Sequence, residues 1–565
     1  MSIYGTLNVG KTALAVSQAA LQTTANNIAN AGNADYSRQV TRLTGNKPLE
    51  VQRGIFLGTG INLAGVDRQI DEALEERLRA AMGESEGGNA ASSWLTRVEA
   101  VYNELGDDDV STLMSEFFNG WSQLANKPQD ISQRQILVQQ GATLAERMRA
   151  TRGQFESLIK DVDSRLTAYA SEVDGIAQKI ADINGQIVVA ESGSGGANGL
   201  RDNRDALLKQ MAQLTNIRTI PQDSGSVDVY IGSTPIILGT MNRGLSYSTI
   251  KDTNGNTQGV YKLKDGSTVP VTGGVVGMVT STRDAMSESL KGLDSLASAM
   301  VFELNKVHSQ GQGLIGYSSV TSNSVVADPT ASLVSKEADL PFKPNNGSFV
   351  LHLRDKATGT LSSSLVKIDL DGLNSNDTTL DSLAADLDAI DGVTASVNGG
   401  RLVIKSDSTA SELTFSQDTS GVLASLGVGG FFTGRDALDI KVSQEIIADP
   451  RRIAAAKNNE PADNQTALAI ANLQGKAVSS LNGQSMKDAY DAQVNTAAGK
   501  TRAARIRAES AQTVLETLDA QRQAVSGVSM DEEAMKLMQY QRAYQAAARV
   551  VSMADEMLQT LMQMV

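Results

Sequence analysis

Apolar residues recur every seven positions at the amino-terminal end of the chain, with small or polar residues between them. One apolar stripe of this period is typical of a helix that buries a single face. We expect a helix from residue 1 to about residue 31. Asn30, Gly32 and Asn33 supply its stop, because Gly and Asn tolerate the left-handed conformation. The stripe consists of Leu7, Leu14, Leu21 and Ile28.

The carboxy-terminal end carries a longer stripe, in which apolar residues alternate three and four apart. This spacing predicts a helix that packs lengthwise against another helix. Ser529 stands three residues before Glu532, the spacing of a capping box, and acidic residues there suit the positive end of the helix. A lone helix could not bury this face, so it requires a partner. The stripe consists of Leu537, Tyr540, Tyr544, Ala547, Val551, Ala554, Leu558, Leu561 and Val565.

Helical periodicity also marks three inner segments, which are residues 155–187, 286–307 and 490–525. Shorter helices are expected near 70–82, 90–105 and 110–126. Gly83, Gly87 and Gly88 predict a break between the first two of these, because glycine weakens a helix interior. The run Asp107-Asp108-Asp109 is interpreted as a solvated cap before the helix at Val110.

Two stretches break the helical period and favour strands. Residues 217–280 and 325–440 carry short apolar runs between Gly, Asn, Asp and Ser residues, and Asn398-Gly399 indicates a hairpin turn. Residues 321–440 contain 16 acidic and 8 basic residues, a net charge of −8 within a chain of net charge −14. We interpret this stretch as a solvated, acidic insertion.

The predicted fold is an α+β multidomain protein with a terminal α-helical coiled coil and a helical bundle, both built from the two chain ends, and inserted, outward-facing, mainly-β domains. The predicted domains are a terminal coiled-coil layer (1–50 with 526–565), a helical bundle (51–215, 281–320 and 441–525), a first β insertion (216–280) and a second, acidic β insertion (321–440).

Composition excludes several classes of function. The net charge of −14 argues against binding to nucleic acid or to an anionic membrane. The chain has no cysteine, which excludes disulfides, thiol catalysis and thiolate metal sites. No long apolar run predicts a membrane-spanning helix, and the amino terminus lacks the features of a cleaved signal peptide.

No constellation in the sequence supports catalysis, a cofactor or a metal. The two histidines, His308 and His352, are too far apart for a zincin helix, so His308 is expected as a cation at a helix end and His352 in an exposed strand. The glycine-rich run at 193–199 follows a helix and is interpreted as a loop. Asp369-Leu370-Asp371-Gly372 resembles the start of a calcium loop, but its glycine comes two positions early and no glutamate closes it.

Both ends carry motifs of a known family. Gln22-Thr23-Thr24-Ala25-Asn26-Asn27-Ile28-Ala29-Asn30, followed by Tyr36-Ser37-Arg38-Gln39, resembles the amino-terminal motif of flagellar rod, hook and hook-associated proteins. Residues 526–533 and 540–546 resemble their carboxy-terminal motif. Within that family the sequence looks most like the hook-associated member at the hook–filament junction, on Phe117-Phe118, Asn126-Lys127-Pro128, Arg134-Gln135, Arg201-Asp202-Asn203-Arg204-Asp205, Asn305-Lys306-Val307-His308 and Asp488-Ala489-Tyr490. Asn33-Ala34-Asp35 replaces the family's usual Thr-Pro-Gly.

The resemblance implies a structural adaptor that joins hook to filament in the bacterial flagellum, exported by the flagellar type III apparatus without a cleaved signal peptide. It implies as partners the hook protein, the second junction protein (hook-associated protein 3), further copies of the chain, and an export chaperone at the carboxy-terminal helix. We expect the 7–28 stripe to pack with residues 537–565 in a layer shared between subunits. The amino-terminal motif adds further residues to this expected assembly site. They are Asn27 and Asn30 on the first helix and Tyr36, Arg38 and Gln39 in the turn that follows it.

Three other interpretations remain open at this stage. The chain could be another axial subunit of hook or filament type, or a surface adhesin that uses residues 321–440. The third is an enzyme, for example a glycan hydrolase that uses the acidic insertion, although no pair of acids stands in a recognisable catalytic setting.

Overall fold

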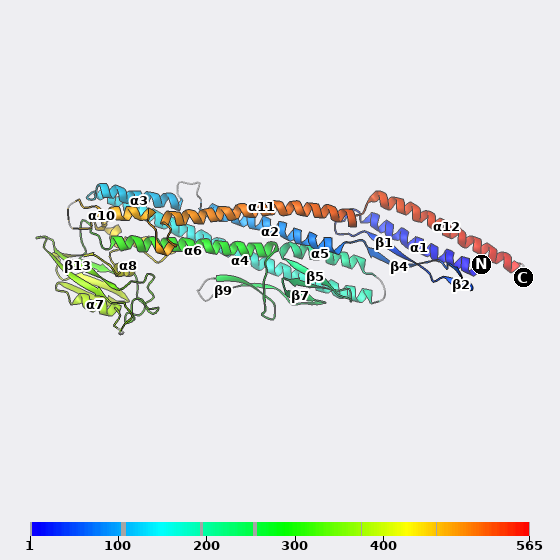
Figure 1. Ribbon diagram of the computed structural model, residues 1–565, viewed down its shortest axis with the longest axis horizontal. Helices are drawn as coiled ribbons and strands as arrows, with labels where there is room; N and C mark the ends of the chain where they lie inside the picture. The colour runs from blue at the N-terminus through cyan, green and yellow to red at the C-terminus, as the bar shows by residue number, and fades with distance from the viewer. Residues whose placement is uncertain are drawn as a thin grey trace. The chain divides into compact units, whose positions relative to one another are not determined.

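The protein is a multidomain α+β structure with long helices at both ends of the chain and small sheets inserted between helices (Figure 1). The computed structural model describes residues 3–102, 109–192, 196–251, 257–373, 376–458, 460 and 462–563. Clustering of contacts divides the chain into two discontinuous units. The first comprises Met1–Trp94, Val162–Arg283 and Arg502–Val565, and the second comprises Leu95–Asp161 and Asp284–Thr501.

Most of the predicted helices are present, and several are longer than expected. The long helices are α1 (Ile3–Ala29), α2 (Glu72–Tyr102), α3 (Val110–Asn126), α4 (Ile131–Glu191), α5 (Asn198–Leu214), α6 (Gly274–His308), α11 (Met486–Ser526) and α12 (Met530–Gln563). The short ones are α7 (Leu380–Asp388), α8 (Val422–Leu426), α9 (Gln444–Ala448) and α10 (Gln465–Ala471), with 3₁₀ turns at Pro450–Arg452, Asn472–Gly475 and Ser479–Leu481. Helices α2, α4, α6 and α11 contribute residues to both units.

The predicted break at three glycines is wrong, because α2 runs through them without interruption. A Cβ atom added at Gly83 would lie 2.5 Å from the carbonyl oxygen of Ala212, and one added at Gly87 would lie 2.7 Å from that of Gly274. Gly88 similarly lies against Ala508. These glycines therefore allow neighbouring backbones to approach α2 closely, which outweighs their low helix propensity.

Helix α3 begins and ends as predicted. Its N-cap is Asp109, whose side chain accepts a 2.8 Å hydrogen bond from the backbone N–H of Thr112. Asp107 and Asp108 lie outside the described residues, as do Gly193, Ser194 and Gly195 of the glycine-rich run.

The sheets of the first unit are small and antiparallel. Residues 39–68 form a two-stranded ribbon, where strands had not been predicted and residues 51–68 had been assigned to the helical bundle. The ribbon comprises β1 (Gln39–Gly45) paired with β4 (Ile61–Arg68), and β2 (Leu49–Gln52) paired with β3 (Ile55–Leu57). Two further sheets have the orders β5-β6-β7-β8 (Ile217–Pro221, Val227–Ile231, Thr234–Leu238, Met241–Asn242) and β11-β10-β9 (Thr268–Val269, Thr257–Lys262, Ser246–Lys251).

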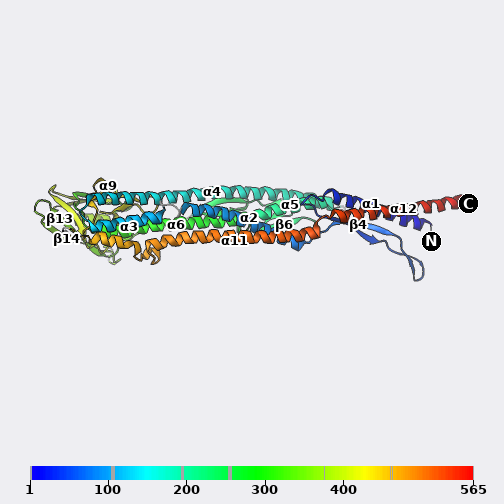
Figure 2. The ribbon, with the colours of Figure 1, turned by 90° about the horizontal axis from the view of Figure 1, so that it is seen from above.

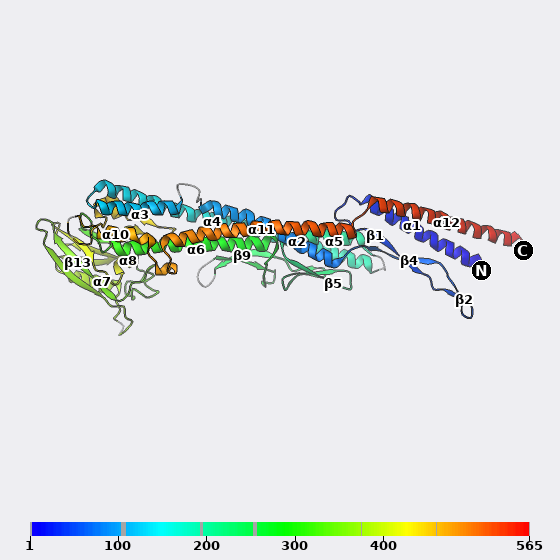
Figure 3. The same ribbon diagram turned by 45° about the horizontal axis from the view of Figure 1, so that its top comes forward.

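The sheets of the second unit lie mainly within the acidic stretch. Their orders are β14-β13-β17 (Leu361–Ile368, Gly347–Asp355, Ser411–Ser416), β12-β16-β15 (Ser319–Thr321, Arg401–Ser406, Val393–Asn398) and β18-β19 (Phe432–Thr433, Lys441–Val442). Helix α7 packs against β15 (Figure 3), and buried aliphatic and aromatic residues between Tyr317 and Val428 form one core. The predicted hairpin is present: Asn398 pairs with Arg401, and both Gly399 and Gly400 between them have positive φ.

Both histidines differ from their predicted states. His308 ends α6 but is 1% exposed, between Trp121 and Phe431, and burial lowers its pKa to about 4. Its Nδ1 donates to the Gly429 carbonyl at 2.9 Å and its Nε2 accepts from the Ala454 N–H at 3.0 Å, so the ring is neutral, not a cation at a helix end. His352 lies in β13 and is partly buried between two serine hydroxyls.

Candidate assembly site

Helices α1 and α12 lie side by side, so that both chain ends belong to one layer of the first unit (Figures 1 and 2). The buried residues of α1 are mostly small or polar: Gly10, Val16, Ser17, Ala20, Thr24 and Asn27. On α12 they are Glu533, Ala547 and Ala554. A Cβ atom added at Gly10 would lie 2.9 Å from Cγ2 of Val551, so this close contact is possible only because glycine has no side chain. The two helices therefore pack through a line of small residues.

The predicted apolar stripes lie at the edges of this contact. Leu7, Leu14, Leu21 and Ile28 are all half-buried, and the most buried line of α1 runs beside them through Gly10, Ser17 and Thr24, which also recur every seven residues. On α12, Ala547 and Ala554 are buried, while the half-buried members of the stripe are Leu537, Tyr540, Tyr544, Val551 and Leu558. Leu561 follows Ala554 by seven residues but is 49% exposed, and Val565 lies outside the described residues.

Asn27 is the centre of a hydrogen-bonded cluster that joins α1, the following turn and the start of α12. Its Nδ2 donates to Oε2 of Glu533 at 2.8 Å and to the Gln39 carbonyl at 2.9 Å. Its Oδ1 accepts from the Tyr36 hydroxyl at 2.7 Å and from the Gln39 N–H at 3.0 Å. A buried amide with every bond formed fixes a unique geometry. We call this cluster, which also includes Arg38, Ser529 and Glu532, the terminal clasp.

Arg38 supplies the charge that balances the acidic start of α12. Its Nε donates to Glu533 Oε1 at 3.1 Å, and its Nη2 donates to Glu532 Oε2 at 3.0 Å. The Glu533 side chain is 1% exposed and also receives Lys536 Nζ at 3.1 Å. The Arg38 N–H donates to the Ser526 carbonyl, so both the backbone and the side chain of Arg38 hold the carboxy-terminal segment. Burial of the Glu533 carboxylate is tolerated because it accepts hydrogen bonds from Asn27, Arg38 and Lys536.

The turn after α1 is built without the family's proline and glycine. Asn33 Oδ1 accepts from the Asp35 N–H at 3.1 Å, and the Asn33 carbonyl accepts from the Tyr36 N–H at 3.2 Å. An asparagine side chain that bonds two residues ahead makes an Asx turn. Asn30 Nδ2 donates back to the Asn26 carbonyl at 2.9 Å, beyond the end of α1 at Ala29. The turn at Asn33-Ala34-Asp35 therefore still places Tyr36 in the terminal clasp, although it lacks the proline and glycine.

Burial raises the pKa of Tyr36 to about 12, with nearby Asp202 and Glu533 adding to the effect. Its hydroxyl therefore stays protonated and donates to Asn27 at any physiological pH. At the cap of α12, the Glu532 N–H donates to Ser529 Oγ at 3.4 Å, while the Glu532 carboxylate accepts from Arg38. The spacing of Ser529 and Glu532 thus serves both the cap and the clasp.

Two arginines with largely buried side chains form three ion pairs at the base of the terminal layer. Arg522 on α11 donates to Glu75 Oε1 at 2.8 Å and, through Nη1, to the Ala34 carbonyl at 2.9 Å. Arg68 at the end of β4 donates to Asp202 and Asp205 of α5 at 2.9 and 2.7 Å. Both contacts hold the segment between α1 and α2 against helices of the same unit.

A second apolar line of α12 faces away from α1. It consists of two short segments, 535–538 and 550–557, within which the apolar residues are three or four apart and 37–60% exposed. We call these two segments together the methionine stripe, and it consists of Met535, Met538, Val550, Met553 and Met557. The sequence predicts no such second face, because its apolar residues are interrupted between Met538 and Val550 by Arg542 and Arg549.

The ribbon of residues 39–68 exposes a further group of large apolar side chains. These are Val40, Leu43, Leu49, Val51, Ile55, Phe56, Leu57 and Ile61. Both this ribbon and the methionine stripe belong to the first unit, and exposed apolar surface of this extent is typical of a protein that binds other proteins.

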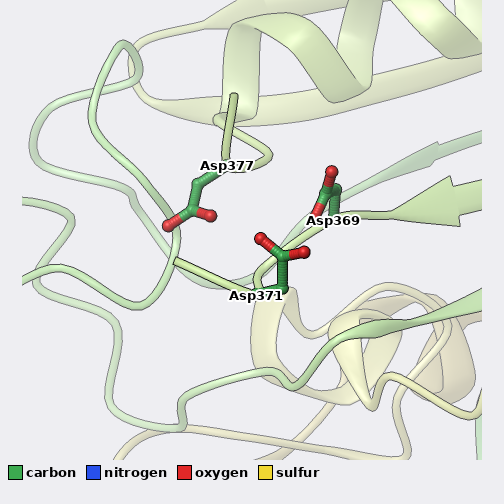
Figure 4. A group of neighbouring side chains, drawn as sticks. All are labelled: Asp369, Asp371 and Asp377. Carbon is green, nitrogen blue, oxygen red and sulfur yellow. The ribbon is translucent and has the colours of Figure 1, made fainter. Parts of the chain in front are cut away.

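One acidic cluster stands out as a possible ion site within the described part of the chain. Carboxylate oxygens of Asp369, Asp371 and Asp377 lie within 4.8 Å of one another in the loop after β14 (Figure 4). All three already accept hydrogen bonds, from Asn376 Nδ2, the Leu373 N–H, and the Gly372 N–H with Ser332 Oγ respectively. Internal donors thus account for the cluster without an ion. None of the described helices is long and apolar enough to cross a membrane.

The chain is similar to known flagellar proteins over nearly its whole length. The family model for the flagellar hook-associated protein FlgK helical domain matches residues 95–321, and that for the flagellar basal body rod FlgEFG protein C-terminal matches residues 520–564. Proteins named flagellar hook-associated protein 1 are 26% identical in Escherichia coli (strain K12), over 98% of each chain, and 25% identical in Bacillus subtilis (strain 168), over 99% of this chain and 97% of that one.

A solved structure shares the fold. It is described as the flagellar hook junction protein FlgK from Burkholderia pseudomallei, with a TM-score of 0.51 and 15% identity over 80% of this chain and 100% of that one. At this identity the likeness concerns the fold alone.

Proposed function

Because this chain belongs to the hook-associated proteins of the flagellar rod, hook and hook-associated family, we propose that it is the structural adaptor that joins the hook to the filament. A structural role in the flagellar axis follows from the family, which is not enzymatic. The position at the junction is the finer step. It is supported by the relatives named flagellar hook-associated protein 1, which align with this chain from end to end.

The observation that carries the proposal is the terminal layer with its exposed methionine stripe. The terminal clasp holds α1 and α12 together inside one chain, so α12 keeps a defined second face. That face is a line of large apolar side chains which a stable single chain has no reason to expose. Burial against a neighbouring subunit would remove it from water, at about 25 cal/mol for each Å² of apolar surface.

Methionine is suited to a helix face that binds several different partners one after another. Its flexible thioether side chain adapts to differently shaped surfaces. In this proposal an export chaperone covers α12 before type III secretion. Outside the cell the same face packs against copies of the chain, against the hook protein below and against hook-associated protein 3 above. The terminal layer (1–50 with 526–565) would form the inner part of the tier, and the 216–280 and 321–440 insertions would face outward.

The test uses isolated hooks from cells that lack this protein. The full chain should bind to hook ends and remain monomeric without them, and deletion of residues 541–565 should abolish binding while leaving the second unit folded. A double substitution, Met553→Glu with Met557→Glu, should act in the same way, whereas Met241→Glu at an equally exposed methionine of β8 should bind normally. Long tubes formed by the purified chain alone would instead indicate a hook or filament subunit.

A further inference from the structure

We propose that the methionine stripe of α12 is an oxidation-sensitive site, at which peroxides convert exposed thioethers to sulfoxides and thereby stop the unassembled chain from assembling. The site is a modification site, and its consequence for assembly rests on the function proposed above. Three observations carry it: the accessibility of these sulfur atoms, the absence of any competing thiol, and the absence of methionine from the face of α12 that contacts α1.

The methionines of the stripe differ in accessibility from those of the described cores. Those on the methionine stripe are 60%, 53%, 58% and 46% exposed, for Met535, Met538, Met553 and Met557 respectively. Six others have no exposed surface at all, and these are Met114, Met148, Met211, Met286, Met300 and Met486. Because oxidation requires the oxidant to reach the sulfur, the stripe should react while the cores stay reduced.

The chain contains 17 methionines and no cysteine. Thiolates, which normally react first with peroxides, are therefore absent, and the thioethers are the oxidisable sulfur groups. In the step itself, a sulfur lone pair attacks one peroxide oxygen, the O–O bond breaks, and the sulfoxide and one molecule of water form. Sulfur loses two electrons and the peroxide gains them. A methionine sulfoxide reductase reverses the change.

The described methionines of α12 are all at least 46% exposed and lie outside its contact with α1. The residues that face α1 include Tyr540, Tyr544, Ala547, Val551 and Ala554, and none of them is a methionine. The terminal clasp likewise contains no sulfur. Oxidation therefore leaves the α1–α12 pair intact and places polar S=O groups on the exposed side chains of α12, most of them along the methionine stripe. A sulfoxide buried at an apolar subunit contact without a donor loses that contact's stabilisation.

The experiment treats the full chain with hydrogen peroxide and measures sulfoxide at each methionine by peptide mass spectrometry. We expect the stripe, Met530, Met562 and Met241 to oxidise, the six buried methionines to remain reduced, and the circular dichroism and melting temperature to stay unchanged. Binding to isolated hook ends should fall about tenfold or more, which corresponds to roughly 1.4 kcal/mol, and a methionine sulfoxide reductase should restore it.

A resistant variant separates the stripe from the other exposed methionines. Met535→Leu, Met538→Leu, Met553→Leu and Met557→Leu combined should bind hooks like the wild type and keep binding after peroxide, although Met530 and Met562 on the same helix still oxidise. Met241→Leu, the matched control, should remain sensitive. Equal binding by fully oxidised and untreated wild type would overturn the inference while leaving the proposed function standing. Failure of untreated protein to bind hooks would overturn the proposed function instead.

Discussion

Asn27 donates a 2.8 Å hydrogen bond to the buried carboxylate of Glu533, across a separation of 506 residues. The same amide group accepts from Tyr36 and from the backbone of Gln39. One side chain thus joins the first helix, the turn that follows it and the last helix.

Substitution of this residue should open the terminal layer. In Asn27→Ala, Glu533 loses a donor while remaining buried, which should cost about 2–3 kcal/mol. Amide hydrogen exchange of α1 and α12 should then be about 30- to 150-fold faster, since each tenfold change equals about 1.4 kcal/mol. Gln22→Ala, at an exposed position of α1, is the control and should change little. Unaltered exchange in both helices of Asn27→Ala would show that the clasp does not hold them.

The close contact at Gly10 should be equally sensitive to added bulk. Gly10→Leu must displace Val551, because even a Cβ atom there would lie 2.9 Å from the valine methyl group. We expect a loss of about 2 kcal/mol or more, typical of overpacking. Gly5→Leu is the matched substitution, because no heavy atom lies within 4 Å of its added Cβ, and it should be neutral or slightly stabilising. Circular dichroism melts compare the two, and equal melting temperatures would refute the packing argument.

Glycines in α2 allow a second steric comparison. Gly87→Ala places a Cβ atom 2.7 Å from a backbone oxygen of Gly274, which cannot rotate away, so we expect destabilisation of about 1–3 kcal/mol. Gly175→Ala in α4 meets nothing within 4 Å and should stabilise the first unit by up to about 1 kcal/mol. Urea unfolding of both variants should shift the midpoint in opposite directions. A shift in the same direction would mean that α2 does not need its glycines for packing.

His308 should make the second unit acid-sensitive. Burial lowers its pKa to about 4, below the value of about 6.5 for an exposed histidine. Between these values the unfolded state binds the proton and the folded state does not. The stabilisation is therefore complete above about pH 6.5 and is lost progressively as the pH falls toward 4, by about 3 kcal/mol in total.

The measurement is the free energy of unfolding at several pH values, for the wild type and for His308→Gln. The variant should be less stable at neutral pH, because it disturbs the bonds to Gly429 and Ala454. The free energy of unfolding of the variant should vary less between pH 6.5 and 4. Because both proteins carry the same carboxylates, subtracting one pH curve from the other removes the carboxylate contribution. Parallel curves would contradict the assignment of this pH dependence to His308.

Local pattern was sufficient to predict helices and hairpins. The extent of α3 followed from Asp109 and Pro128, and the β15–β16 turn followed from Asn398-Gly399. The break in α2 was mispredicted because the close approach of Gly274 to Gly87 is a tertiary contact with no local trace. The ribbon at 39–68 was missed because many of its apolar side chains face outward, so it lacks the alternation of a half-buried strand.

The assembly site was only partly predictable. Period alone placed Leu7 and Leu14 at the centre of the helix contact, but the buried line runs through Gly10 and Ser17, since small residues let the two backbones approach. Motif resemblance identified Asn27, Tyr36 and Arg38 without saying what they bind. Glu533, which accepts from Asn27 and Arg38, was interpreted only as a charge at a helix end, because a contact between residues 506 apart leaves no signal in either segment alone.

The separation between Asn27 and Glu533 means that the terminal layer can form only in a chain that has been synthesised past Glu533. Helix α1 is made first, yet Glu533, which bonds Asn27, is synthesised 506 residues later. A copy cut short before residue 530 has neither Glu533 nor Val551, so its first helix finds no partner within the molecule. The terminal layer is therefore absent from any chain that lacks α12. Given the assembly role proposed above, truncated copies would therefore be left out of the growing structure.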